Sequence, residues 1–214
     1  MLQPRPPACY GLDIETDTAA GGLDPRRAGI LAVALSGPGG DTVFTGPEAA
    51  LLSALDDALS GLTTGIIVTW NGSGFDLPFI AERAAVAGID LGLRLVLDPT
   101  IERSRPPLPG HSGAYRAAWH QHRHLDAYSA YRSFADNRHL SNGLKAVARR
   151  AGFPAVEVDA SLVHRLSSSA LQRYVASDAS LARRLAMWRW TEMEGHIDPP
   201  PRQWSIDPRA PSYE

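Results

Sequence analysis

With 214 residues, of which 44% are hydrophobic and 21% charged, the chain has the composition of an ordinary soluble globular protein and the length for one large domain. Its single cysteine, Cys9, excludes an internal disulfide, and no apolar run approaches the roughly 20 residues that span a bilayer, so we expect a cytoplasmic protein without a membrane segment. The net charge of −2 is unevenly distributed: residues 1–102 carry a net charge of −8 and residues 103–150 one of +7. This contrast suggests a metal site beside a surface that binds a polyanion.

The N-terminal half of the sequence predicts alternating strands and helices. Short apolar or alternating runs are typical of strands, and leucines at helical spacing are typical of amphipathic helices. These patterns predict strands over residues 8–15, 29–37, 41–46, 65–70 and 93–98, and helices over residues 47–62 and 75–89. Gly88 is the expected C-terminal end of the second helix.

Beyond Pro99 the pattern weakens and then becomes helical. The C-terminal half predicts a loop over residues 103–113, a hairpin over 115–128, and amphipathic helices over 139–153 and 167–195. Ser167 to Ser169 are N-cap candidates for the last helix. This order of elements predicts an α/β fold with a central mixed β-sheet flanked by helices.

Two acidic residues in the first strand, within the sequence YGLDIET, require an explanation. Side chains alternate along a strand, so Asp13 and Glu15 point to one face, while Leu12 and Ile14 point to the other and belong to the core. Two carboxylates ~4 Å apart in a partly desolvated setting repel each other by about 4 kcal/mol. The pair therefore needs a compensating partner.

Further acids occupy two of the predicted helices. Asp76 follows Gly-Ser-Gly at a helix start, where the helix dipole alone explains a first-turn acid. Tyr174 and Asp178 are four residues apart and share one helical face, which by itself indicates only a solvent-facing pair. Apolar residues near the same side of this helix place Asp178 at the border of the core: Leu171, Val175, Leu181, Leu185 and Trp188.

Asp13, Glu15, Asp76 and Asp178 together form a candidate ligand set made only of oxygen atoms. If these carboxylates converge, their repulsion must be offset by cations, and oxygen ligands suit Mg²⁺ or Mn²⁺. Two such ions ~3.5–4 Å apart can activate a water and stabilise the leaving oxygen of a phosphoryl displacement. The set therefore predicts two divalent cations and a nucleic-acid phosphodiester substrate.

Three motifs resemble those of the DEDD superfamily of 3′–5′ exonucleases, in its tyrosine-bearing branch. YGLDIET resembles the first motif, NGSGFD the second and YVASD the third, and they occur in the family's order. The extension FDLPFI and the segment HLDAYSAYR, followed by LSNGLKAVARRAG, are similar to the proofreading domain of family B DNA polymerases and its stand-alone relatives. The resemblance spans residues 8–190 and implies a ribonuclease-H-like fold.

The resemblance also implies roles for individual residues. The four carboxylates would be the metal ligands, with Asp13 bridging the ions, and Tyr174 would hold the attacking water. Asn71 and Phe75 would shape the pocket for the terminal nucleotide, and Thr16 would offer contacts there. Ser177, which precedes Asp178, stands where the other branch of the superfamily has a histidine.

The basic segment 103–124 matches no motif and leaves two interpretations open. Its arginines and histidines could grip a single strand, with Tyr115 and Trp119 as stacking platforms. Alternatively, it is a variable surface loop with a buried tryptophan. Asp126 is expected to cap the helix that follows it, and a zinc site at His120, His122 and His124 is an alternative that lacks a nearby cysteine.

These observations predict a ribonuclease-H-like 3′–5′ exonuclease domain over residues 1–196, followed by a proline-rich tail over residues 197–214. The expected substrate is the 3′ end of single-stranded DNA, as in DNA repair. The polymerase portion of the large family B enzymes is absent from this sequence, so we expect the chain to act alone or with a polymerase or helicase partner. The alternatives are an RNA 3′-end trimming exonuclease and a non-catalytic module that binds single strands or a replication partner.

Overall fold

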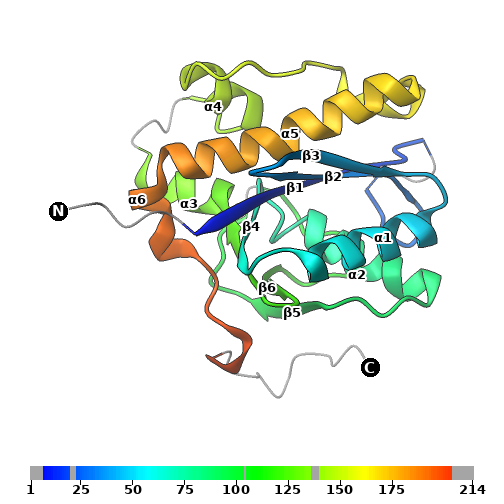
Figure 1. Cartoon of the computed structure of the whole chain (residues 1–214), viewed down its shortest axis with the longest axis horizontal. Coiled ribbons are helices and arrows are strands. Elements are labelled where there is room, and N and C mark those ends of the chain that lie inside the picture. The colour runs from blue at the N-terminus through cyan, green and yellow to red at the C-terminus, as the bar shows by residue number, and fades with distance from the viewer. Residues whose placement is uncertain (1–6, 20–22, 104, 136–139, 204–214) are drawn as a thin grey trace.

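A seven-stranded mixed β-sheet organises the chain, whose computed structural model describes residues 7–19, 23–103, 105–135 and 140–203 (Figure 1). The strands are β1 (Ala8–Thr16), β2 (Ile30–Gly37), β3 (Gly40–Thr45), β4 (Gly65–Thr69), β5 (Leu93–Asp98), β6 (Ala114–Trp119) and β7 (His122–Asp126). Their spatial order is β3-β2-β1-β4-β7-β6-β5. β1, β4 and β7 are parallel, and the other neighbouring pairs are antiparallel. The predicted central mixed sheet is therefore confirmed.

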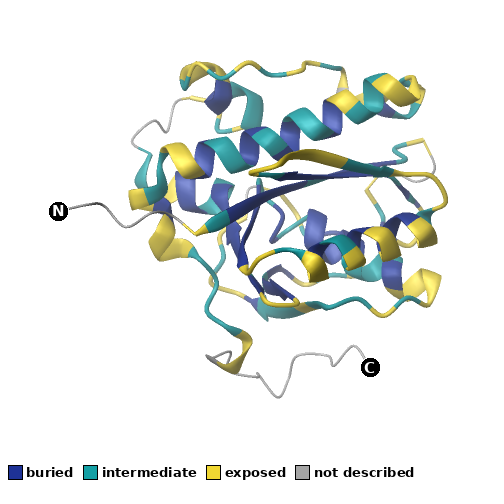
Figure 2. Ribbon diagram, in the orientation of Figure 1, coloured by how far each residue is buried: buried dark blue, intermediate teal, exposed yellow. Residues whose placement is uncertain are grey.

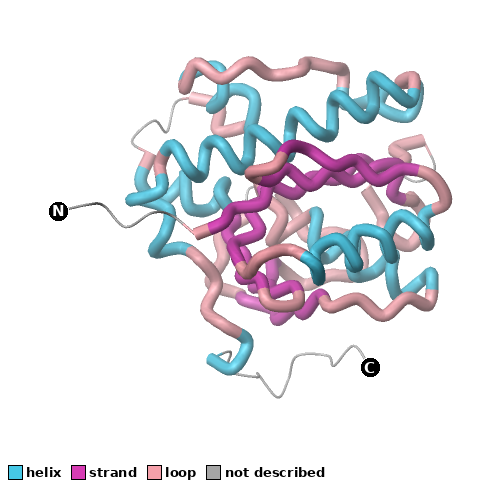
Figure 3. The backbone as a smooth tube through the Cα atoms, in the orientation of Figure 1, coloured by secondary structure: helices cyan, strands magenta, loops and turns pink. Residues whose placement is uncertain are grey.

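Helices cover both faces of this sheet (Figures 1 and 3). They are α1 (Glu48–Gly61), α2 (Asp76–Ala87), α3 (Ala127–Phe134), α4 (Leu144–Arg150), α5 (Ser168–Trp188) and α6 (Trp190–Met193), with short 3-10 helices at Ala160–Arg165, Glu194–His196 and Pro201–Gln203. A hydrophobic core lies on each face of the sheet. The first core joins the sheet to α1 and α2, and the second joins it to α3, α4, α5 and α6. Within the described residues, no helix has both the length and the apolar character needed to cross a bilayer.

The side chains of β1 alternate between these two cores as predicted. Leu12 and Ile14 are 0% and 4% exposed and pack with α1 and α2. Asp13 and Glu15 therefore face α5, which lies across β1 to β3 (Figure 1). Figure 2 shows that β1 is largely buried. The strand thus presents its two acids to a helix instead of to bulk water.

Small residues bring α5 close to the sheet at this point. Ala32 and Ala34 of β2 form a cluster with Val175 and Ala179 of α5, and all four side chains are fully buried. Gly11 of β1 has no side chain to separate the two elements. The acids of β1 and those of α5 can therefore approach each other.

Two helices are shorter in the structure than the sequence predicts. The helix expected over 139–153 is formed only as α4, Leu144–Arg150, and Gly152 follows it with a φ of +76° that favours glycine. Residue 139 lies outside the described residues. The helix expected over 167–195 begins as predicted, with Ser167 accepting a hydrogen bond from the Ala170 N–H, but α5 ends at Trp188. Arg189 leaves helical geometry there and separates α5 from α6.

Candidate active site

Three of the predicted ligands converge where α5 crosses β1. One carboxylate oxygen each of Asp13, Glu15 and Asp178 lies within 4.8 Å of the other two, and we call these residues the carboxylate cluster. Asp13 and Glu15 meet because strand alternation puts them on the face that α5 covers. Asp178 joins them from a segment more than 160 positions further along the sequence.

Asp76 approaches β1 from a different direction. It is the first residue of α2 and is 4% exposed, and its Oδ1 accepts a hydrogen bond from the backbone N–H of Ile14 at 3.3 Å. Asp76 is not a member of the carboxylate cluster, but its charge raises the pKa of both Asp13 and Glu15. The structure therefore brings all four predicted carboxylates into one region.

Burial raises the pKa of each of these four carboxyl groups. The pKa of Glu15 rises from 4.5 to about 8, that of Asp76 from 3.8 to about 7 and that of Asp178 from 3.8 to about 6. The pKa of Asp13 is also well above its usual range, because burial is reinforced by the charges of Asp76, Asp178 and Glu15. Without a compensating cation, the charged forms of these acids are disfavoured.

Lys145 of α4 is a site residue that sequence reasoning missed. Its Nζ lies 3.2 Å from Oδ2 of Asp178 and 3.7 Å from the centre of the Tyr174 ring. The ammonium lowers the pKa of Asp178 and of Asp13 and so opposes the effect of burial. A sequence signal was available, because Lys145 is the only lysine in a chain with 21 basic residues.

Tyr174 lies beside the carboxylates, one turn before Asp178 on α5. It is 6% exposed, and burial together with the charges of Glu15 and Asp178 raises the pKa of its hydroxyl above the ordinary value of 10.0. The hydroxyl therefore keeps its proton across the physiological pH range. The predicted pairing of Tyr174 and Asp178 on one buried helical face is found in the structure.

The donor set fits a divalent cation. Oδ1 of Asp178 is buried and has no hydrogen-bond partner within the described part of the chain. A buried acceptor left unpaired costs about 1–3 kcal/mol, and more when charged. A hard cation among the carboxylate oxygens would satisfy this atom and neutralise the cluster, and Mg²⁺ and Mn²⁺ prefer such ligands.

A cavity of about 520 Å³ opens beside Asp13 and Asp76. Asn71 and Phe75 line it, whereas Thr16 is buried at the end of β1 and is not among the described residues that line the cavity. Further lining residues are the aromatic Trp70 and Tyr128 and the basic Arg105. The cavity thus combines acids, aromatic rings and an arginine.

The basic segment 103–124 contacts the cavity through an arginine and not through its aromatic rings. Tyr115 and Trp119 are 6% and 1% exposed, and the Trp119 indole N–H donates to Asp56, so neither ring is a stacking platform. The alternative with a buried tryptophan is therefore the one that holds, although Tyr115 and Trp119 lie in β6 and not in a loop. Arg105 is exposed and lines the cavity, so among the described residues of this segment it is the one that reaches the site.

Two secondary expectations can also be compared with the structure. Asp126 caps α3 as predicted, since its carboxylate accepts hydrogen bonds from the N–H groups of Tyr128 and Ser129.

The three histidines of the zinc alternative have separate partners: His120 pairs with Asp56, His122 bonds Gly65 and Leu59, and His124 bonds Thr69 and Asp198. Within the described residues, the carboxylate cluster is the group that could hold a metal.

Comparison with solved structures supports the fold. The family B DNA polymerase from the hyperthermophilic archaeon Pyrobaculum calidifontis superposes with a TM-score of 0.68 at 22% identity. The match covers 87% of this chain and 25% of that chain, and it confirms the ribonuclease-H-like architecture.

Comparison with curated sequences points to the same group of proteins. The catalytic subunit of DNA polymerase epsilon from Saccharomyces cerevisiae is 28% identical over 147 residues, and the Candida glabrata protein of that name is 28% identical over 136 residues. These matches cover 66% and 62% of this chain, which spans only 6% of the length of either relative.

A family model described as a predicted 3′–5′ exonuclease related to the exonuclease domain of PolB matches residues 41–200. This range includes Asp76, Tyr174 and Asp178, whereas Asp13 and Glu15 precede it. The match extends over most of the chain. The chain therefore belongs to the family of predicted 3′–5′ exonucleases related to the exonuclease domain of PolB.

Proposed function

We propose that this protein is a metal-dependent 3′–5′ exonuclease that removes nucleotides from the 3′ end of single-stranded DNA. The observation that carries the proposal is the carboxylate cluster, with its oxygens within 4.8 Å of one another and the unpaired Oδ1 of Asp178 buried beside them. Such an arrangement is costly for folding alone and is suited to binding cations.

Asp13, Glu15, Asp76 and Asp178 would hold two divalent cations, Mg²⁺ or Mn²⁺. When bound, the two ions would supply an activated water and would stabilise the charge that develops on the leaving oxygen. The carboxylates contribute negative charge fixed on β1, α2 and α5, so they need little rearrangement to receive the ions.

Tyr174 and Lys145 would act on the water and on the charges of the site. The Tyr174 hydroxyl keeps its proton, so it can position the attacking water by hydrogen bonding. Membership of the tyrosine-bearing branch is part of the proposal and is supported by Tyr174. The Lys145 ammonium, held at Asp178, adds positive charge that attracts the phosphodiester.

The cavity beside Asp13 is the proposed site for the terminal nucleotides. Phe75, Trp70 and Tyr128 offer aromatic surfaces, and stacking of a base on such a ring is worth about 1–3 kcal/mol. Asn71 offers amide hydrogen bonds, and Arg105 offers a guanidinium for a phosphate. Stacking requires bases that are not paired, which supports a single-stranded 3′ end.

The test is degradation of a single-stranded oligonucleotide labelled at its 5′ end, with Mg²⁺ or Mn²⁺ and with a chelator. We expect a ladder of shortened products from the wild-type protein, and none from Asp13→Ala or Asp178→Ala. Asp90→Ala, which removes an exposed acid after α2, is the matched control and retains activity. Full activity of either site variant would overturn the site assignment.

Matched DNA and RNA oligonucleotides decide the substrate. Faster degradation of DNA supports the proposal, whereas faster degradation of RNA favours an RNA-trimming exonuclease. Binding of single strands without degradation under any metal condition would identify a non-catalytic binding module. A polymerase or helicase partner is a proposal that rests on the sequence. The same holds for the division into a domain over residues 1–196 and a tail over residues 197–214, although Ile197 and Asp198 at the start of this tail pack against the domain.

A further inference from the structure

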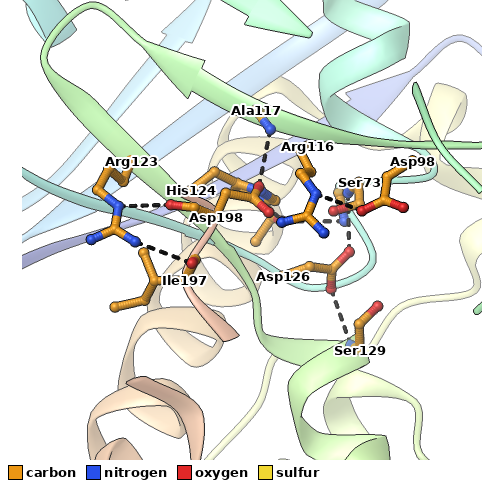
Figure 4. A network of polar contacts seen from close by, with 12 residues as sticks. Ser73, Asp98, Arg116, Ala117, Arg123, His124, Asp126, Ser129, Ile197 and Asp198 are labelled. Atoms are coloured by element: carbon orange, nitrogen blue, oxygen red, sulfur yellow. Dashed lines mark hydrogen bonds and ion pairs between the residues drawn. The ribbon is translucent and has the colours of Figure 1, made fainter. Parts of the chain in front are cut away.

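A buried chain of polar side chains lies behind the loop that carries the second motif. Oδ2 of Asp198 accepts a hydrogen bond from Nδ1 of His124 at 3.0 Å. Nε2 of His124 lies 2.8 Å from Oγ1 of Thr69, which in turn accepts a hydrogen bond from the N–H of Gly72 at 3.2 Å. We call Asp198, His124 and Thr69 the relay; Figure 4 shows its Asp198 and His124.

The relay has the order of groups found in hydrolases that use an activated hydroxyl, but its hydroxyl is inaccessible. Thr69 is 0% exposed and His124 is 1% exposed. In the tautomer with hydrogen on Nδ1, His124 donates to Asp198 and accepts from the Thr69 hydroxyl, whose oxygen remains free to accept from Gly72. The hydrogen bonds from Asp198 through His124 and Thr69 thus lead to the backbone of Gly72.

Gly72 belongs to the loop of residues 71–75, which joins β4 to Asp76 at the start of α2. This 71–75 loop is held tightly: a Cβ atom on Gly72 would lie 2.3 Å from Oγ1 of Thr69. Asn71 has a φ of +73°, a conformation that costs energy for a residue other than glycine. Surrounding contacts must therefore impose the shape of the loop.

Asp126 supplies a second set of contacts to the same loop. Its Oδ1 accepts a hydrogen bond from the N–H of Asn71 and its Oδ2 one from the N–H of Ser73, both at 3.0 Å. Ser73 and Asp126 lie together in the network of Figure 4. Asp126 and the relay thus bind three successive backbone N–H groups of the loop.

The far end of the relay is anchored in the sheet. β6 and β7 pair only at Ala118–Arg123 and Trp119–His122. Beyond this point Asp198 lies between the two strands: its N–H donates to the His124 carbonyl at 2.8 Å, and its Oδ2 accepts from the Ala117 N–H at 2.9 Å. The Arg123 guanidinium also donates to the carbonyls of Ile197 and Asp198. Asp198 therefore completes the hydrogen bonding of the sheet.

We propose that the relay positions the 71–75 loop, so that Asn71, Phe75 and Asp76 face the cavity, and that Asp198 thereby links the C-terminal segment to substrate binding. Thr69, His124 and Asp198 are positioning residues, since none of them lines the cavity that holds the proposed substrate. The expected effects on KM rest on the proposed exonuclease function, whereas the expected effect on the conformation of the 71–75 loop does not.

The test compares Thr69→Val, which removes the hydroxyl and keeps the shape, with Thr69→Ser, which keeps the hydroxyl. For Thr69→Val we expect a loss of about 10- to 100-fold in kcat/KM, with a raised KM for the oligonucleotide. Thr69→Ser retains most of the activity. A variant that is only less stable would lower the active fraction, and hence the apparent kcat, without changing KM.

His122 provides a matched control on the same strand. It is also 1% exposed, and both of its ring nitrogens are hydrogen-bonded, one by the Gly65 N–H and the other to the Leu59 carbonyl, but it lies toward the opposite end of β4 from Thr69. We expect His124→Asn and Asp198→Ala to raise KM, and His122→Asn to leave KM unchanged even where it lowers the melting temperature.

Hydrogen exchange of the amides of residues 71–73 measures the positioning without any need for activity. We expect Thr69→Val to accelerate exchange at these amides and His122→Asn not to. If Thr69→Val matches Thr69→Ser in both exchange and KM, the relay proposal is overturned, while the exonuclease stands. If the wild-type protein degrades neither DNA nor RNA, the proposed function fails, and the exchange comparison alone decides the relay.

Discussion

Gly11 of β1 lies directly against Ala179 of α5: a Cβ atom on Gly11 would be 2.0 Å from the Ala179 carbonyl oxygen. Asp178 precedes Ala179, and Asp13 follows Gly11 by two positions on the same face of the strand. The distance between helix and sheet at this contact therefore controls the distance between the two carboxylates.

Gly11→Ala should separate the helix from the strand. Because the new methyl group would meet backbone atoms, which cannot rotate away, we expect a loss of about 1–3 kcal/mol in the free energy of unfolding. We also expect reduced affinity for Mn²⁺, since the carboxylate cluster would widen. Urea unfolding and calorimetric titration measure the two effects. Gly61→Ala in α1 is the control, because nothing lies within 4 Å of the new Cβ. This variant should lose neither stability nor affinity for Mn²⁺.

Lys145→Ala should lower the exonuclease activity strongly, although Lys145 lies outside the three motifs. The variant leaves Asp178 without its cationic partner and removes a positive charge next to Tyr174. We expect kcat to fall about 100-fold, the magnitude seen when a single preorganised electrostatic group is removed. The measurement is single-turnover degradation of the labelled oligonucleotide.

Two further variants test whether the loss of activity is specific to Lys145 or reflects only the change in net charge. Lys145→Arg keeps the charge and should recover part of the activity. Arg94→Ala removes an exposed cation from β5 and should behave like the wild-type protein. Equal losses in Lys145→Ala and Arg94→Ala would mean that only net charge matters, and would refute a specific role for Lys145.

The metal-free protein should lose stability as pH rises. Glu15, Asp76 and Asp178 have pKa values raised to about 8, 7 and 6, so between about pH 4 and pH 8 the folded protein holds protons that the unfolded chain has released. Stability falls with pH wherever the folded state binds more protons. We expect the melting temperature in a chelator to be lower at pH 8 than at pH 5.

Metal should reverse this trend, because cations bind the deprotonated carboxylates. We expect the gain in melting temperature from Mn²⁺ to be larger at pH 8 than at pH 5. Asp13→Asn removes one charge from the carboxylate cluster. In the chelator, the melting temperature of this variant should fall less between pH 5 and pH 8 than that of the wild-type protein. A chelated wild-type protein that becomes more stable from pH 5 to pH 8 would contradict the electrostatic description.

Arg105→Ala should weaken substrate binding in a salt-dependent way. If the guanidinium contacts one phosphate, the slope of log K against log salt should decrease in magnitude by about 0.7 for a single strand. We expect a raised KM with little change in kcat. Arg103→Ala, two positions away in the same loop and outside the described cavity lining, is the control and should leave the slope unchanged.

Much of the fold and the proposed ligand set follows from local patterns. Alternation along β1 separated Leu12 and Ile14 from Asp13 and Glu15, and the spacing of Tyr174 and Asp178 put both on one face of α5. The extents of α4 and α5 were less predictable. Their ends depend on residues such as Gly152 and Arg189, whose conformations no periodic pattern indicates.

Sequence alone determined which side chains share a face of a strand or helix, because that depends only on the repeat of the backbone. It therefore grouped Asp13 with Glu15, and Tyr174 with Asp178. Only the tertiary structure decided that Gly11 lets α5 approach β1, that Lys145 occupies the site, and that Asp198 reaches Thr69 through His124. These contacts join segments far apart in the chain, and packing fixes them in ways that local spacing does not encode.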